Sequence, residues 1–459
     1  MLSSLFLSLF AALPQDDFPE KAPAAGAEAH VAYQTTSAGG LNYLWWLPKG
    51  YDPAEPRALT VILHGTGLDY RWGAWNHAPG VFRSKDVVVS VDGTSPGADG
   101  TRLFLGEPDD AEAFRGFLAE MRQAFAVRDV FLYGHSQGGF FVVYYAGEFP
   151  ETVTGVVAHA SGAWNWTNMS KGLKKVAVAF MHGTADEVVP YRQSMGSRGS
   201  FVEAGYPLTH LLRLINYSHW PNAVRANEAL GWCEGMTTDD PERALDAARS
   251  LLRPKREDEY SWRTVPSFSG AYEVLMRFTK KGYQPFKKRA SKDQTETAER
   301  WMADIEEHAE AHVARLQETV PRRLSLDGGP WLGHLISLRE DFRGVRPVES
   351  YVKKVGFDKL LAEHEEAAGE LIAAWRDEQA SVPDRFEAVV TRLEDVFLFE
   401  GLPADMRPKM REWKQDAGLV VIPAAVLDRY AVFQRWEEGW DDGLKAYRKE
   451  WGRWKGAGR

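Results

Sequence analysis

The sequence predicts an α/β fold with a mostly parallel central sheet, followed by a mainly α-helical region. In the first half, short runs of β-branched and apolar residues alternate with stretches of helical periodicity, a pattern typical of a parallel sheet covered by helices. Beyond residue 235, glycine becomes rarer and charged residues become denser. This change of composition indicates two architectures, so we predict an α/β domain over residues 31–235 and a helical domain over residues 236–459.

The strands of the first domain are predicted from their apolar runs. Several runs are apolar on both faces, as expected for central strands of a covered sheet. The segment 109–125 begins with acidic residues, which favour a helix N-terminus, and we predict a helix there. The runs that predict strands are 43–47, 59–63, 86–91, 129–133, 155–160, 176–180 and 210–215.

The second half shows helical periodicity. From residue 302 onward the apolar positions follow one another in steps of three and four, which indicates one buried helix face. A tryptophan-rich stripe over 433–454 has the same spacing. We therefore predict a packed helical bundle. The apolar positions of the first stripe are Met302, Ile305, Ala309, Val313, Leu316 and Val320.

Composition limits the classes of function. With 459 residues, 44% of them hydrophobic, the chain has enough apolar sequence for a sizeable core. A formal net charge of −9 argues against general nucleic-acid binding. The sequence has no polybasic cluster of lysine and arginine, so it gives no support for a role at a membrane surface. Cys233 is the only cysteine, so an internal disulfide is impossible and the fold must rest on packing.

The N-terminus resembles an export signal. Residues 2–13 form an apolar run of the length found in signal peptides, and they are too few to span a bilayer. We predict that residues 1–30 are a signal peptide and flexible segment of an exported, periplasmic or extracellular protein. The positively charged region that normally precedes such a run is missing. The alternative is therefore a cytoplasmic protein in which this segment is a disordered start or a short buried helix. We expect no stable membrane insertion.

The stretch Tyr133–Gly139 contains the motif G-x-S-x-G around Ser136. A predicted strand precedes it, and a predicted helix that ends at Pro150 follows it. This strand–turn–helix context is what a nucleophile elbow requires, because the glycines allow a sharp turn that exposes the serine hydroxyl. The alternative is an ordinary glycine-rich turn. We predict that Ser136 is a nucleophile.

An oxyanion site is predicted from the loop after an earlier strand. The strand 59–63 leads into His64 and a Gly-Thr-Gly turn, in which backbone N–H groups are free to donate. Our candidates are the N–H groups of Thr66 and Gln137, which would stabilise a developing oxyanion. We expect His64 to support this loop through hydrogen bonds. A plain strand-to-loop turn is the alternative.

An acid and a base follow Ser136 in the sequence. Asp186 lies after a predicted strand and a glycine turn, where a carboxylate can orient an imidazole; its neighbour Glu187 is the alternative. His219 lies in the loop after the last predicted strand. His210 is the rival base, but it opens that strand and would lie at the wrong edge of the sheet.

The order Ser136, Asp186, His219 is the order found in α/β-hydrolases. Together, the stretches "LHGTG", "GHSQGG", "HGTADEVVPY" and "SHWP" resemble secreted esterases of the polyhydroxybutyrate depolymerase and feruloyl esterase type. The resemblance covers residues 40–235. It implies ester hydrolysis through an acyl-enzyme, with no metal or organic cofactor. The chain departs from those enzymes in having no possible disulfide and a long helical C-terminal region.

The resemblance implies a small-molecule or polymer-linked ester as substrate. Trp75, Trp164 and Trp220 lie in loops expected near the site, and we predict that they contact substrate; ordinary loop packing is the alternative. His308 and His312 lie four residues apart but lack the adjacent glutamate of a zinc protease, so we predict a solvated helix face and no metal. The sequence does not indicate a partner for the helical domain.

Two other functions remain open at this point. A catalytic triad alone does not choose the leaving group, so a peptidase or another acyl hydrolase of the same fold is one alternative. The other is a non-catalytic binding or scaffold protein that acts through its helical domain.

Overall fold

A computed structural model describes much of the chain between residues 27 and 360. Within this span it omits 81, 98–99, 184–185, 187, 215–216, 253–266, 280–285, 287–288, 319–334 and 336–337. The predicted leader lies almost wholly outside the described residues. The stripe 433–454, Val320 and the alternative acid Glu187 also lie outside them.

The chain divides into two compact units. The first contains the described residues of Met1–His182, Gln193–Leu212 and Trp220–Thr237. The second contains those of Gly183–Arg192, Arg213–His219 and Thr238–Arg459. Two short segments that continue from the sheet therefore belong to the same unit as the helical region.

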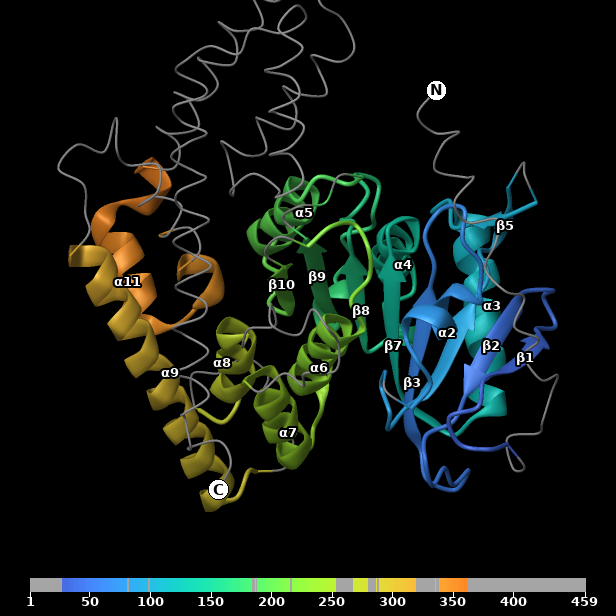
Figure 1. Ribbon diagram of the computed structural model, residues 1–459, viewed down its shortest axis with the longest axis horizontal. Coiled ribbons are helices and arrows are strands. Elements are labelled where there is room, and N and C mark those ends of the chain that lie inside the picture. The colour runs from blue at the N-terminus through green and yellow to red at the C-terminus, as the bar shows by residue number, and fades with distance from the viewer. Residues whose placement is uncertain are drawn as a thin grey trace, which may run out of the picture. The chain divides into compact units, whose positions relative to one another are not determined.

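An eight-stranded sheet organises the first unit (Figure 1). Its order is β1-β2-β4-β3-β7-β8-β9-β10. The pairs β1–β2 and β2–β4 are antiparallel, whereas β4–β3, β3–β7, β7–β8 and β8–β9 are parallel. The strands are β1 (Tyr33–Thr36), β2 (Asn42–Trp46), β3 (Arg57–Leu63), β4 (Val87–Val91), β7 (Val127–His135), β8 (Gly155–His159), β9 (Ala177–Gly183) and β10 (Thr209–Leu214). A separate two-stranded ribbon joins β5 (Ser95–Pro96) to β6 (Arg102–Leu103).

The apolar runs correctly predicted the central strands. Every residue of β4, β8 and β9 is buried, as expected for strands covered on both faces. Both β7 and β9 extend further than predicted. In β7 this is because Gly134 and His135 still pair with Ala158 and His159 of β8. Sequence reasoning missed β1, whose YQTT sequence is polar and partly exposed at the sheet edge.

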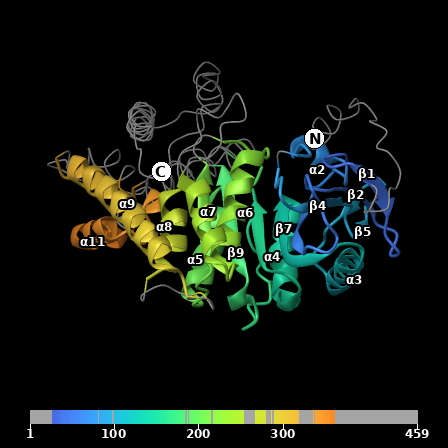
Figure 2. The ribbon, with the colours of Figure 1, turned by 90° about the horizontal axis from the view of Figure 1, so that it is seen from below.

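Helices cover both faces of the sheet (Figure 2). On one face, Gly73 of α2 (Trp72–Asn76) packs against Ser90, and Cys233 of α6 (Ala223–Thr237) packs against Gly155. On the other face, Phe117 contacts Tyr43 of β2. The helices of this second face are α3 (Pro108–Ala124), which matches the predicted helix to within one residue at each end, and α4 (Gln137–Glu148). Helix α5 (Arg192–Glu203) connects β9 to β10.

The described part of the second unit contains packed helices, as predicted. They are α7 (Pro241–Leu252), α8 (Phe268–Met276), α9 (Lys292–Glu318) and α11 (Arg346–Val355). Helix α9 contacts the other three. Its buried face contains most of the predicted apolar stripe, but Trp301 is buried where we expected Met302.

One prediction for α9 was wrong. His308 and His312 do not form a solvated face, because both rings pack against Phe342 at centroid distances of 5.9 and 5.6 Å. His308 also contacts Phe268. Burial lowers the pKa of His308 to about 4 and that of His312 to about 3. These histidines are therefore neutral, partly buried packing groups at physiological pH.

Candidate active site

Ser136 occupies a sharp turn between β7 and α4. Its backbone has φ 53° and ψ −118°, a conformation that costs free energy for a residue with a side chain and that clusters at functional sites. The turn is held by hydrogen bonds: the Ser136 N–H donates to the His159 carbonyl at 2.9 Å, and the Gly139 N–H donates to the Ser136 carbonyl at 2.9 Å. The serine is thus fixed at the carboxyl end of a central strand.

Close approach explains the glycines around this serine. A Cβ at Gly138 would lie 2.6 Å from the carbonyl oxygen of His64 and 2.7 Å from that of Leu63. A Cβ at Gly134 would overlap the Gly138 carbonyl. Only glycine allows β7 to turn into α4 while α4 packs directly on the end of β3.

The predicted oxyanion loop lies against the serine. A Cβ at Gly65 would be 3.1 Å from the Ser136 Cβ, so the chain passes Ser136 one residue before Thr66. Among the described residues, the N–H groups of Thr66 and Gln137 donate to no backbone oxygen. Gln137 is the first residue of α4, where the helix dipole favours negative charge.

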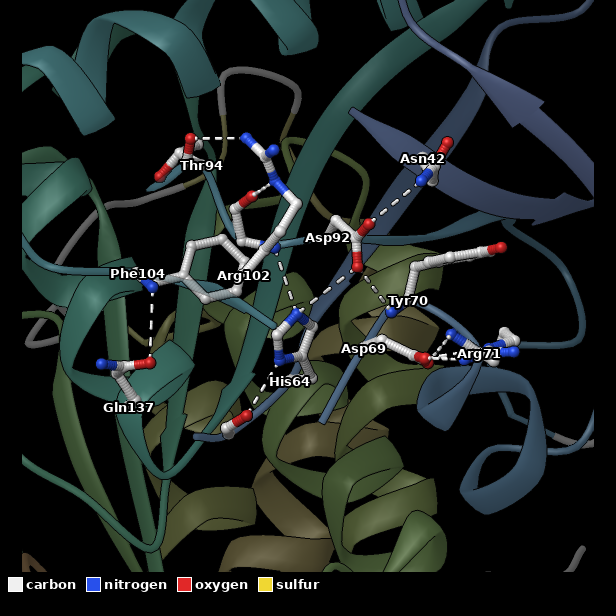
Figure 3. A network of polar contacts seen from close by, with 12 residues as sticks. Asn42, His64, Asp69, Tyr70, Arg71, Asp92, Thr94, Arg102, Phe104 and Gln137 are labelled. Atoms are coloured by element: carbon white, nitrogen blue, oxygen red, sulfur yellow. Dashed lines mark hydrogen bonds and ion pairs between the residues drawn. The ribbon is translucent and has the colours of Figure 1, made fainter. Parts of the chain in front are cut away.

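His64 holds this loop from inside the protein (Figure 3). Its side chain is fully buried, and its Nε2 accepts a hydrogen bond from the Gly93 N–H at 3.1 Å. An amide N–H can only donate, so the proton of the neutral ring is on Nδ1, which donates to the Gly65 carbonyl at 2.9 Å. Burial lowers the pKa of His64 to about 4. His64 therefore supports the loop through hydrogen bonds, as we expected.

Asp92 is a second buried group of this network, which sequence reasoning missed. It lies directly after β4, with Oδ1 3.9 Å from the Nε2 of His64. The same oxygen accepts the Tyr70 N–H at 3.2 Å, which ties down the far end of the loop. Burial raises the pKa of Asp92 to about 6. The signal that could have revealed Asp92 is its position, since polar residues at the carboxyl ends of parallel strands converge on one edge.

The Gln137 side chain anchors a second loop. Its Oε1 accepts a hydrogen bond from the Phe104 N–H at 3.4 Å (Figure 3). The buried carboxylate of Asp110 holds the same loop by accepting from the Thr94 hydroxyl at 2.7 Å and from the Leu105 N–H at 3.0 Å. The segment after β6 is thereby fixed beside the start of α4.

Asp186 and His219 form a buried pair in the second unit. The Nδ1 of His219 lies 2.8 Å from Oδ2 and 3.1 Å from Oδ1 of Asp186. Because a carboxylate can only accept, His219 carries its proton on Nδ1, and its Nε2 is the basic nitrogen. The Asp186 carboxylate also accepts the N–H groups of Val188 and Val189 at 2.8 and 2.9 Å.

A glycine allows the two segments of this pair to meet. A Cβ at Gly183 would overlap the carbonyl of Tyr217 and lie 2.9 Å from that of Ser218. The structure therefore brings Asp186 and His219 together within the second unit. Ser136, Thr66 and Gln137 come together within the first. His210, the rival base, is buried against Trp232 with a ring-centroid distance of 5.0 Å.

The predicted substrate-contacting tryptophans have different environments. Trp75 is 36% exposed and Trp220 is 45% exposed. Trp164 is partly buried and stacks on both Phe140 and Trp166. Trp166, which we did not select, is the most exposed tryptophan of the described residues, at 56%.

A group of buried histidines behind the elbow also escaped sequence reasoning. His135 stacks on Trp72 at 5.1 Å and contacts His159 at 5.2 Å. The His159 Nδ1 is 2.8 Å from the Tyr133 hydroxyl. His77 packs on the Tyr133 ring, and burial lowers its pKa to about 3. These rings pack against one another and against the end of β7, directly before Ser136.

The described residues offer neither a metal site nor a membrane span. No group of three or more His, Cys, Asp or Glu side chains among them is arranged to hold a metal ion. Likewise, none of the described helices combines the length and the apolar composition needed to cross a bilayer.

Residues 93–214 match a protein family described as alpha/beta hydrolase fold. A comparison with curated proteins found no match. Together, the family match and the parallel strand order confirm the predicted α/β-hydrolase fold.

Solved structures with similarity to this chain include several esterases. One is a thermostable esterase, with 17% identity and a TM-score of 0.32 over 41% of this chain and 54% of that one; the match thus spans about half of that protein. Another is a ferulic acid esterase from the anaerobic fungus Anaeromyces mucronatus, with 16% identity and a TM-score of 0.35 over 47% and 92% of the two chains. A third is Est1E from Butyrivibrio proteoclasticus, with 18% identity and a TM-score of 0.33 over 43% and 95%.

Proposed function

We propose that this protein is a serine hydrolase that cleaves carboxylic esters through an acyl-enzyme. The observation that carries the proposal is the backbone of Ser136, which has φ 53° at the turn between β7 and α4. A buried strand, a strained serine and a helix N-terminus in this order form a nucleophile elbow. Such strain is retained where the surrounding structure enforces it.

We propose Asp186 and His219 as the acid and base that act on Ser136. In this mechanism the Nε2 of His219 removes the hydroxyl proton as the serine oxygen attacks the ester carbonyl. The imidazolium that forms is stabilised by Asp186, whose carboxylate already accepts the Nδ1 proton. His219 then protonates the leaving alcohol, and a water molecule activated in the same way releases the acid.

The oxyanion is proposed to bind the N–H groups of Thr66 and Gln137. Two fixed amide dipoles contribute several kcal/mol of transition-state stabilisation. The support for this assignment is the position of Gly65 beside Ser136 and the buried hydrogen bonds that hold the loop through His64. A preorganised loop does not have to be reoriented during the reaction.

A fluorophosphonate probe tests the nucleophile directly. We expect the wild-type chain to be labelled and Ser136→Ala to remain unlabelled. The matched control is Ser200→Ala, which removes an exposed serine on α5 and should leave labelling unchanged. If Ser136→Ala is labelled as strongly as the wild type, the proposal is wrong.

A substrate pair separates ester hydrolysis from peptide hydrolysis. The same acyl group is supplied as an alkyl ester and as an amide, and kcat/KM is measured for both. We expect turnover of the ester alone. Preferential cleavage of the amide would replace the esterase proposal by a peptidase.

A further inference from the structure

Arg102 of β6 binds main-chain carbonyls directly after β4 (Figure 3). Its Nε donates to the Gly93 carbonyl at 2.6 Å, and its Nη2 donates to the Thr94 carbonyl at 2.8 Å. Strand β6 also lies directly on Gly93, because a Cβ at that position would overlap the Leu103 nitrogen. The guanidinium presents its donors in a fixed planar arrangement, so Arg102 restricts the orientation of the chain at both carbonyls.

Gly93 is in turn bonded to His64, and His64 is bonded to the predicted oxyanion loop. The Gly93 N–H donates to the His64 Nε2 at 3.1 Å, which leaves the proton of the neutral ring on Nδ1. That Nδ1 donates to the Gly65 carbonyl at 2.9 Å. The Gly65 carbonyl and the Thr66 N–H belong to one planar trans peptide and point in opposite directions. The bond that holds the carbonyl on His64 therefore aims the Thr66 N–H away from this ring.

The geometry points to Arg102 as a positioning residue for the Thr66 N–H, the proposed oxyanion donor. Three hydrogen bonds in series join them: Arg102 to Gly93, Gly93 to His64, and His64 to the peptide that carries the donor. The inference rests on the proposed hydrolase function, in which this N–H meets the negative charge that forms when Ser136 attacks. A fixed donor stabilises that charge only where its direction is correct, and a misplacement of about 1 Å can lower a rate by about 10²-fold.

A second anchor holds the β5–β6 ribbon without Arg102. The buried Asp110 carboxylate accepts the Thr94 hydroxyl at 2.7 Å, directly before β5, and the Leu105 N–H at 3.0 Å, after β6. Asp110 thus closes the ribbon at its base. Truncation of Arg102 should therefore leave the ribbon in place, while the chain that bonds His64 gains freedom. Loss of this side chain is expected to change the oxyanion loop without unfolding the protein.

Steady-state kinetics of the full chain with an alkyl ester test the role of Arg102. We expect Arg102→Ala to lower kcat about 30-fold and to leave KM nearly unchanged, because the donor acts on the transition state. Arg128→Ala is the control and should leave kcat unchanged, since exposed Arg128 also donates to a main-chain carbonyl, that of Pro56 at 3.2 Å. An unchanged kcat in Arg102→Ala, or a loss of kcat/KM that lies wholly in KM, overturns the assignment.

A thionoester of the same acid and alcohol separates positioning from general structural damage. In this substrate sulfur replaces the carbonyl oxygen, and sulfur is a weak hydrogen-bond acceptor. The ratio of kcat/KM for the ester to kcat/KM for the thionoester therefore reports how well the oxyanion donors are aimed. We expect this ratio to fall about fivefold in Arg102→Ala and to keep the wild-type value in Arg128→Ala. An equal loss on both substrates, which leaves the ratio unchanged, overturns the proposal.

Nitrogen-15 NMR of the histidine rings reports the same coupling without catalysis. The His64 Nδ1–H is buried and hydrogen-bonded, so its resonance should be observable in the wild type, and its absence from His64→Gln assigns it. We expect this resonance to shift or broaden in Arg102→Ala and to stay unchanged in Arg128→Ala. An unaltered resonance in Arg102→Ala overturns the inference. If Ser136 does not react with fluorophosphonate, the proposed hydrolase is wrong, whereas an altered His64 resonance would still show that Arg102 holds the loop.

Discussion

The turn at Ser136, our proposed nucleophile elbow, and the Asp186–His219 pair are held in different ways. The elbow depends on steric closeness: Gly138 leaves no room for a Cβ between α4 and the carbonyls of Leu63 and His64 at the end of β3, and the surrounding strands are buried. The two segments of the pair also approach closely at Gly183, but the side chains that would do chemistry are positioned by hydrogen bonds, in which the Asp186 carboxylate orders its own turn and holds one ring nitrogen. From this difference we expect substitutions in the elbow to lower the stability of the protein. Substitutions in the pair should instead lower the catalytic activity and leave the fold intact.

The largest effect is expected at the pair. Asp186→Asn should reduce kcat for ester hydrolysis by roughly 10⁴-fold, because an amide can donate to Nδ1 of His219 and so favour the wrong tautomer. Thermal unfolding should change little. Asp240→Asn is the control, since Asp240 also caps a turn by accepting a backbone N–H, from Glu242 at 2.9 Å. An Asp186→Asn enzyme with near-normal kcat would exclude Asp186 as the orienting acid.

Adding a methyl group at Gly138 in the elbow should lower the stability of the protein. Gly138→Ala places a Cβ 2.6 Å from the His64 carbonyl oxygen, and we expect the free energy of unfolding to fall by about 3 kcal/mol, in the range of overpacked cores. Gly116→Ala is the matched control, because nothing lies within 4 Å of that position on α3; it should stabilise the protein slightly. Urea denaturation of both variants measures the difference. Equal stability of the two would contradict the steric account of the elbow.

The buried histidines of the first unit predict sensitivity to acid. Burial lowers the pKa of His64 to about 4 and that of His77 to about 3, whereas a histidine in the unfolded chain titrates near 6.5. Below about pH 6.5 the unfolded chain therefore binds more protons at these two rings, so their contribution to the free energy of unfolding falls as the pH is lowered toward 4, whereas Asp92, whose raised pKa favours protonation of the folded state, opposes this fall. Each ring should contribute about 2 kcal/mol of loss between pH 7 and pH 5.

Urea denaturation at pH 7 and at pH 5 measures this loss of stability. His77→Phe should reduce the difference between the two pH values, because a phenyl ring does not titrate and His77 already packs among the Trp72, Phe82 and Tyr133 rings. A variant with an unchanged pH dependence would show that His77 is not one of the groups responsible.

Local pattern was enough to predict much of this protein. Apolar runs such as 59–63 and 86–91 predicted buried central strands, because a strand covered on both faces needs apolar residues at every position. The motif around Ser136 predicted the turn between β7 and α4, since only small residues fit such a turn. The three- and four-residue spacing of Ile305, Ala309 and Val313 predicted the buried face of α9.

Tertiary structure decided the features that depend on distant residues. Nothing in the spacing of His308 and His312 shows that Phe342 covers them. The sequence also does not distinguish Trp164, which is stacked against Phe140, from Trp166, which faces solvent two residues later. Likewise, Asp92 and Gly93 reach His64 only because β4 lies beside β3. Periodicity records whether a position is buried, but which side chains meet there is set by the packing of the whole chain.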